Sequence, residues 1–244
     1  MAKKFKTSIE KIIFQVRHKP ILSFYDKLYK HEKLIEFFPD WQTDRLQLAL
    51  KDYEKKHNVV IKHDSITYES DNYSNSDAKK IVDAISTSIS ELDKKKDIQR
   101  LGFRFFSLVP VSFSFEELNT IVTMKYISNE LLKKIEDPKD FTITIDSSID
   151  KLNYKLYLGP IKVDEIPNFI RYNINQHIDP RTSKQYTEMA NIIDKYPKTS
   201  LYFDIDFHAK DASITLSDFY VQCIESFNKI FNDIINYTFK EKIK

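Results

Sequence analysis

Glycine is scarce in this chain of 244 residues, which contains only Gly102 and Gly159. Average usage of about 7% would give roughly 17 glycines. The phosphate-binding loops of nucleotide- and dinucleotide-binding folds, and the nucleophile elbow of serine hydrolases, each need two or more glycines close together. The sequence therefore argues against dinucleotide-dependent oxidoreductases, P-loop enzymes and serine hydrolases of the common folds.

Cysteine and long apolar runs are also missing. The single cysteine, Cys223, permits no internal disulfide and no cysteine metal cluster. No run approaches the ~18 apolar residues of a membrane-spanning helix, and the first residues lack the apolar core of a signal peptide. We expect a cytoplasmic protein with no membrane partner.

The charges are balanced overall but uneven along the chain. The net charge is +2, from 38 basic and 36 acidic residues. Residues 1–63 carry 14 basic and 8 acidic side chains, whereas residues 64–244 carry 24 and 28. A basic first quarter suits an acidic partner such as nucleic acid, although 32 lysines against 6 arginines also fit an AT-rich coding sequence. A solvated lysine surface is the open alternative.

Alternating apolar residues predict strands, and apolar residues at helical spacing predict helices. Predicted strands cover residues 9–17, 45–51, 59–63, 65–69, 98–105, 141–145, 152–158 and 201–208. Predicted helices cover residues 23–38, 77–92 and 115–135 and begin again near 216. Ser114 and Glu117 form a capping box, which sets the start of the third helix.

The order strand, helix, antiparallel strands, helix occurs twice, which is typical of an α+β fold. We expect an antiparallel sheet with long amphipathic helices on one face, built from two pseudo-repeats and similar in shape to the TATA-binding protein or a helix-grip fold. Residues 1–96 would form the N-terminal half and residues 97–244 the C-terminal half, with an irregular insertion near 160–199. The two halves would form one continuous domain.

Three segments resemble a family of uncharacterised prokaryotic proteins known only for its sporadic distribution. Residues 8–16 resemble the family's opening strand, roughly P-I-V-E-V-V-x-E-I. Residues 100–108, with Arg100-Leu101-Gly102-Phe103-Arg104 at their start, resemble R-L-G-L-R-Y-x-N-R. Residues 201–207, which contain Asp204-Ile205-Asp206, resemble L-L-D-I-D-V. The resemblance spans nearly the whole chain and implies no established reaction.

One departure from the family pattern concerns function. Ser107 and Leu108 stand where the family has Asn and Arg, so an activity carried by those two family residues would be missing here. The sporadic distribution implies an accessory gene, for example one used in defence against phage.

The strand near residue 205 carries the first candidate site. Alternation places Asp204, Asp206 and His208 on one face, and two carboxylates with an imidazole are ligands for a divalent cation. Such a site would activate water for phosphoester hydrolysis. The alternative is that these residues simply line the solvated face of the sheet.

The strand that contains Gly102 carries the second candidate site. Arg100 and Arg104 share a face with Gly102, and a guanidinium fits a phosphate or a carboxylate. The alternative is a pair of salt bridges to Asp204 or Asp206. Gly102 would either let a ligand approach the sheet or mark a bulge, whereas Gly159, before Pro160, is interpreted as a turn residue. The lysines that would join Arg100 and Arg104 in contacting phosphates are Lys3, Lys4, Lys6 and Lys11.

Two further residues are interpreted structurally. Cys223 lies on the apolar stripe of the last helix and is predicted to be a buried small side chain rather than a nucleophile. Trp41 is predicted to be a core or interface anchor.

We therefore expect a non-enzymatic binding or assembly protein without a cofactor, acting as an accessory component of a prokaryotic defence or other multi-protein system. Its partner would be another protein or a second copy of the chain. Two alternatives stay open: a metal-dependent phosphoesterase or nuclease using Asp204, Asp206 and His208, and a nucleic-acid-binding module.

Overall fold

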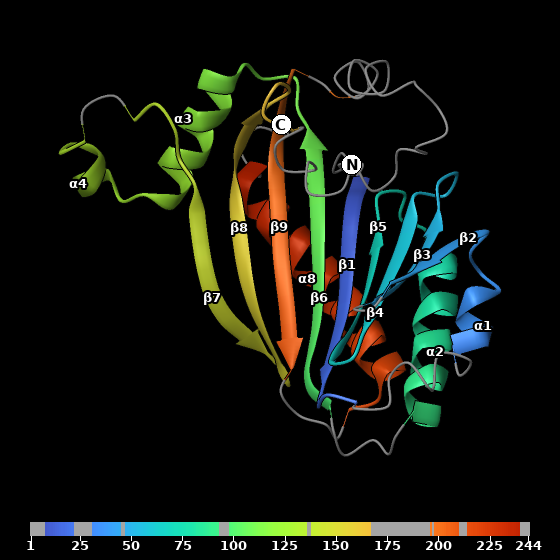
Figure 1. Ribbon diagram of the computed structural model, residues 1–244. Helices are drawn as coiled ribbons and strands as arrows, with labels where there is room; N and C mark the ends of the chain where they lie inside the picture. Colours follow the sequence, from blue (N-terminus) through green and yellow to red (C-terminus); the bar gives the residue numbers. More distant parts are fainter. Residues whose placement is uncertain are drawn as a thin grey trace.

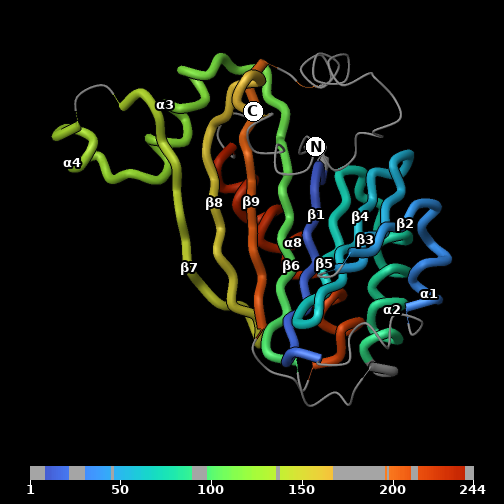
Figure 2. Tube along the Cα trace, in the orientation of Figure 1, coloured from blue at the N-terminus to red at the C-terminus, as the bar shows by residue number. Residues whose placement is uncertain are grey.

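A computed structural model of the chain is dominated by one nine-stranded antiparallel sheet (Figure 1). The structure describes residues 8–21, 31–44, 47–92, 98–135, 138–166, 196, 198–209 and 214–239. The strands are β1 (Ser8–His18), β2 (Asp40–Thr43), β3 (Gln47–Asp52), β4 (His57–Lys62), β5 (Ser65–Ser70), β6 (Ile98–Pro110), β7 (Ile143–Ile149), β8 (Leu152–Lys162) and β9 (Thr199–Ala209). Their order is β2-β3-β4-β5-β1-β6-β9-β8-β7, so β1 and β6 run side by side at the centre (Figure 2).

The described helices differ greatly in length. The described helices are α1 (Glu32–Ile35), α2 (Asn75–Leu92), α3 (Phe115–Tyr126), α4 (Asn129–Leu132) and α8 (Leu216–Phe239). Only α2 and α8 are long, and both lie behind the sheet in Figure 1, whereas α3 and α4 lie beyond one corner of it.

The expected fold class is therefore wrong. The chain is mostly one large antiparallel sheet with few helices, and not an α+β fold with long helices along one face. The described elements do follow the order strand, helix, antiparallel strands, helix in both halves, but the halves are not exact repeats, because five strands precede residue 97 and four follow it. The predicted helix over 115–135 is also interrupted: Ile127 is extended, and Ser128 starts α4 by accepting a hydrogen bond from the Leu131 backbone N–H at 3.3 Å.

The apolar face of the sheet forms the main core because the strands alternate. Phe14 on β1, Phe103 and Phe105 on β6, and Phe203 on β9 are fully buried on this face. The aromatic stripe of α8 packs on them: the rings of Phe105 and Phe227 stack at 4.7 Å. Aromatic pairs at such distances stabilise a core beyond the area that they bury.

Tyr220 joins α8 to the start of α2. Its hydroxyl donates to Asn75 Oδ1 at 2.6 Å and lies 3.3 Å from the Tyr73 hydroxyl, while its ring stacks on Phe103 at 5.3 Å. Burial and the neighbouring Tyr73 hydroxyl raise the pKa of Tyr220, so the phenol keeps its proton and its hydrogen bond.

A smaller apolar cluster occupies the opposite face near the ends of β6, β8 and β9. Its buried members are Phe106, Leu108, Ile161, Ile166 and Tyr202, and Tyr196 packs against them. The Tyr196 hydroxyl donates to the buried Glu10 carboxylate at 2.5 Å. The described ends of the 160–199 segment therefore cover this end of the face, while the rest of that segment lies outside the described residues.

Two local predictions are confirmed. The capping box at Ser114 and Glu117 is present with both hydrogen bonds, and Cys223 is buried, where burial raises the pKa of its thiol. The strand β2 was missed, because four residues are too few for a pattern. Trp41 on this edge strand is 60% exposed, so the core alternative for this residue is wrong and the interface alternative stays a prediction.

Neither the bulge considered for Gly102 nor the turn predicted for Gly159 is present. Gly159 lies within β8 and not in a turn, and an added Cβ would meet the Phe141 carbonyl oxygen at 2.9 Å. Gly102 has no positive φ, lies away from the register shifts of the β1–β6 pair, and an added Cβ would meet only the Phe207 carbonyl oxygen at 3.9 Å. The fold therefore requires glycine at 159 and does not require it at 102.

This contrast predicts opposite effects of the same substitution. Gly102→Ala should raise the free energy of unfolding by roughly 0.5–1 kcal/mol, because glycine within a strand loses more backbone entropy on folding. Gly159→Ala should lower it by about 1–3 kcal/mol, because the methyl group overpacks a backbone contact. Urea unfolding followed by circular dichroism measures both, and a Gly102→Ala protein less stable than the wild type would contradict the assignment.

Candidate functional site on the polar face of the sheet

The polar face, opposite α2 and α8, is organised in rows that cross the strands. Residues paired across neighbouring strands point to the same side, so the register assigns each row. The central row has no acidic residue, lysine or arginine; it contains Gln42, Ala49, Val60, Thr67, Gln15, Gly102, His208, Asn153 and Ser148.

Two flanking rows carry the charges. The basic row, two residues along the strands from the central row, contains Gln47, Lys62, Ser65, Arg17 and Arg100. The alternating row, on the other side, contains Asp40, Lys51, Asn58, Glu69, Ile13, Arg104, Asp206, Lys155 and Asp146. Positive and negative side chains follow one another along the alternating row, which leaves it close to neutral.

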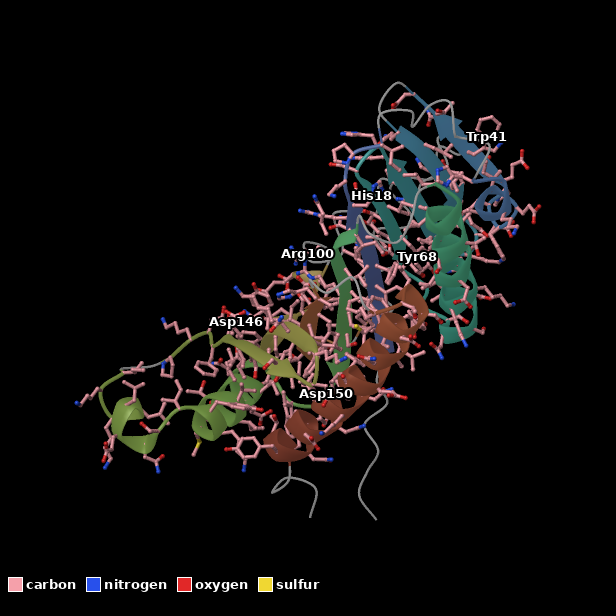
Figure 3. The ribbon with its side chains drawn as sticks, turned by 90° about the horizontal axis from the view of Figure 1, so that it is seen from below. His18, Trp41, Tyr68, Arg100, Asp146 and Asp150 are labelled. Atoms are coloured by element: carbon pink, nitrogen blue, oxygen red, sulfur yellow. The ribbon has the colours of Figure 1, made fainter. Side chains whose placement is uncertain are left out.

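A groove of about 810 Å³ lies on this face over β1 and β2–β5. Side chains from all three rows line it: Gln15, Arg17, His18, Gln42, Gln47, Ala49, Lys51, Asn58, Val60, Lys62, Asp64, Ser65, Thr67, Glu69 and Gln99, with Pro20. Figure 3 shows His18 and Arg100 at the adjoining ends of β1 and β6, where the groove closes, and Trp41 at the outer edge of the sheet.

A chain of hydrogen bonds holds the Arg17 guanidinium at the basic end of the groove. Thr67 Oγ1 accepts from Gln15 Nε2 at 3.1 Å, and Gln15 Oε1 accepts from Arg17 Nε at 3.0 Å. Arg17 and Lys62 make no ion pair with any described residue, so their charges face the groove.

The two arginines predicted as an anion site are paired with the two predicted metal ligands. Arg104 forms a bidentate ion pair with Asp204, with Nε–Oδ1 and Nη2–Oδ2 distances of 2.8 and 2.5 Å. Hydrogen bonding to Asp204 raises the pKa of Arg104 above its ordinary value. Arg100 and Asp206 make a longer pair at 3.9 Å, in which both side chains are about 40% exposed. The two arginines therefore form salt bridges with Asp204 and Asp206, which was the alternative to an anion-binding site.

The geometry does not support a metal centre at the predicted ligands. Asp204, Asp206 and His208 do share the polar face, but within the described ranges no group of three or more His, Cys, Asp or Glu side chains is placed to hold a metal ion. Asp204 is almost fully buried against Arg104, which occupies the lone pairs that a cation would need.

The predicted lysines divide into two groups. Lys3, Lys4 and Lys6 lie outside the described residues. Lys11 is buried, and its ammonium lies 4.0 Å from the Asp71 carboxylate. Burial lowers the pKa of Lys11, against the opposing effect of Asp71. Because its side chain is buried beside Asp71, just beyond the end of β5, Lys11 is not presented to a phosphate.

The sequence reasoning missed the residues that do line the groove. Gln15, Arg17, Lys51, Lys62 and Thr67 are the polar positions of predicted strands, and that alternation was the available signal. The alternation does not show which strands are neighbours, so the row that places Lys62 and Arg17 on either side of Ser65 could not be predicted.

No known family matches the chain, and no curated protein matches it at a significant level. No described helix is long and apolar enough to cross a membrane.

The difference between the two ion pairs gives a prediction. Arg104→Met should lower the free energy of unfolding by about 1–3 kcal/mol, because the Asp204 carboxylate, only 5% exposed, would lose its partner. Arg100→Met, the matched control on the same strand, should change it by less than about 1 kcal/mol, because an exposed pair is screened by water. Equal losses in urea unfolding would contradict this account.

Proposed function

We propose that this protein is a non-enzymatic binding protein that holds its ligand in the groove on the polar face of the sheet. The observation that carries this proposal is the groove itself, with a volume in the range of small-molecule sites and a mostly polar lining. The Arg17 guanidinium at its basic end donates to Gln15, which in turn donates to Thr67, as in a preorganised binding site.

The two alternatives from the sequence receive less support. A metal-dependent phosphoesterase needs free carboxylates, whereas Asp204 and Asp206 are paired with arginines. A nucleic-acid-binding module needs an extended positive surface, whereas the basic row on this face ends at Arg100, which lies 3.9 Å from Asp206, and the alternating row contains acidic as well as basic side chains. The accessory role in a multi-protein system, the protein partner or homo-oligomer, and the cytoplasmic location stay predictions from the sequence and its family resemblance.

A bulky residue in the groove tests the proposal. Val60, on the floor of the groove, would be changed to Trp, and Ser148 of the same row on β7, outside the groove, would be changed to Trp as the matched control. Ligands are found by thermal-shift screening of a metabolite library against the wild type and confirmed by calorimetry.

We expect Val60→Trp to weaken binding of each confirmed ligand by about tenfold or more, equivalent to about 1.4 kcal/mol, because the indole occupies the site. Ser148→Trp should leave binding unchanged. Ligands that bind both variants equally well would place the binding site elsewhere and overturn the proposal.

A further inference from the structure

The groove is polarised along the strands, and this polarity indicates the chemistry of its ligand. The basic row closes one end with Lys62 and Arg17. The central row, about 6.8 Å further along the strands, offers amides and the Thr67 hydroxyl, and Glu69 and Lys51 lie at the other end. A ligand that matches this order has an anionic group at one end and hydrogen-bonding groups along the rest.

We propose that the groove binds a phosphate monoester of a sugar or similar polyol, with the phosphoryl group between Arg17 and Lys62. This inference rests on the proposed function and names the class of ligand. The two cations stand on β1 and β4, on either side of Ser65 in the basic row. They are separated by two strand spacings, about 9.6 Å between backbones, a gap that two long side chains span from both sides of one phosphoryl group.

The fixed orientation of Arg17 supports a phosphoryl group in particular. Because Gln15 accepts from Nε, the two Nη groups remain as parallel donors, and a guanidinium with two such donors binds phosphate in a bidentate manner. Gln15 has no contact with the phosphoryl group in this arrangement: it is a positioning residue that acts through Arg17.

The rest of the lining favours a hydroxyl-rich ligand over a nucleobase. Proteins that bind single-stranded nucleic acid do so largely by stacking its bases on aromatic side chains. Among the described residues that line the groove, the one aromatic ring is that of His18, which is buried with its Nδ1 2.8 Å from the Lys19 carbonyl oxygen. Amides, the Thr67 hydroxyl and Glu69 match sugar hydroxyls, each of which donates and accepts.

Calorimetry with defined probes tests the inference. We expect ribose 5-phosphate or glucose 6-phosphate to bind the wild type at least about tenfold more tightly than ribose, glucose or inorganic phosphate. Arg17→Ala and Lys62→Ala should each weaken that binding by about tenfold or more. Lys155→Ala, which removes a cation from the same face outside the groove, should leave it unchanged. All variants should keep the circular dichroism spectrum and melting temperature of the wild type, since these side chains are exposed or half-exposed.

The role of Gln15 has its own readout. Gln15→Ala should weaken binding of the sugar phosphate and leave the already weak binding of the unphosphorylated sugar as it was, because only the orientation of Arg17 changes. Gln15→Glu should restore binding in part, because a carboxylate also accepts from Arg17 Nε.

Three results would overturn the inference. One is no binding of either sugar phosphate, another is equal binding of phosphorylated and unphosphorylated sugars, and the third is tighter, steeply salt-dependent binding of a 5′-phosphorylated oligonucleotide, which would indicate nucleic acid. None of these three results decides the proposed function. A ligand of any class whose binding is lost in Val60→Trp and kept in Ser148→Trp would still locate binding in the groove.

Discussion

The packing of α8 on the central strands β6 and β9 is the interaction on which the rest of the structure depends. Phe105 and Phe203, fully buried on these strands, contact Phe227 of the helix at 4.7 and 5.9 Å. Strand residues alternate between faces, so burying these rings on one side forces their neighbours Arg104 and Asp204 to the other. The core therefore decides which residues become available for function.

The consequences differ between the two halves of the polar face. Around β6 and β9 the charged side chains neutralise one another, with Arg104 on Asp204 and Arg100 near Asp206. Over β1 and β3–β5 the register brings Arg17 and Lys62 together around Ser65, and neither makes an ion pair with a described residue. Charges that are already paired are not available to a ligand, whereas exposed cations without an ion pair are.

The sequence was a good guide to the elements and a poor one to their assembly. The strand around Phe103, the hairpin around Asp64 and the start of α8 follow from local alternation and helical spacing, which depend on neighbours in the chain. The expected fold class was wrong because the proportion of sheet to helix depends on how far each helical segment continues. The apolar pattern continues to residue 135, but α3 ends at Tyr126, before the extended Ile127. The groove was missed for a related reason: Lys62 and Arg17 are far apart in sequence and become neighbours only through the pairing order.

The case of Gly102 shows how the two kinds of information combine. From the sequence, a glycine between two arginines suggested a close approach to the sheet, and the structure removes the competing explanations: no positive φ, no bulge at that position and no crowding at its Cβ. Although the fold does not require Gly102, this residue still affects the surface. It has no side chain, so the central row is lower there than at Gln15, at the point where the row passes out of the groove. On the next strand the same row contains the larger side chain of His208. A ligand longer than the groove would therefore extend over Gly102 toward the paired charges of β9, and it would meet hydrogen-bonding groups there rather than free cations.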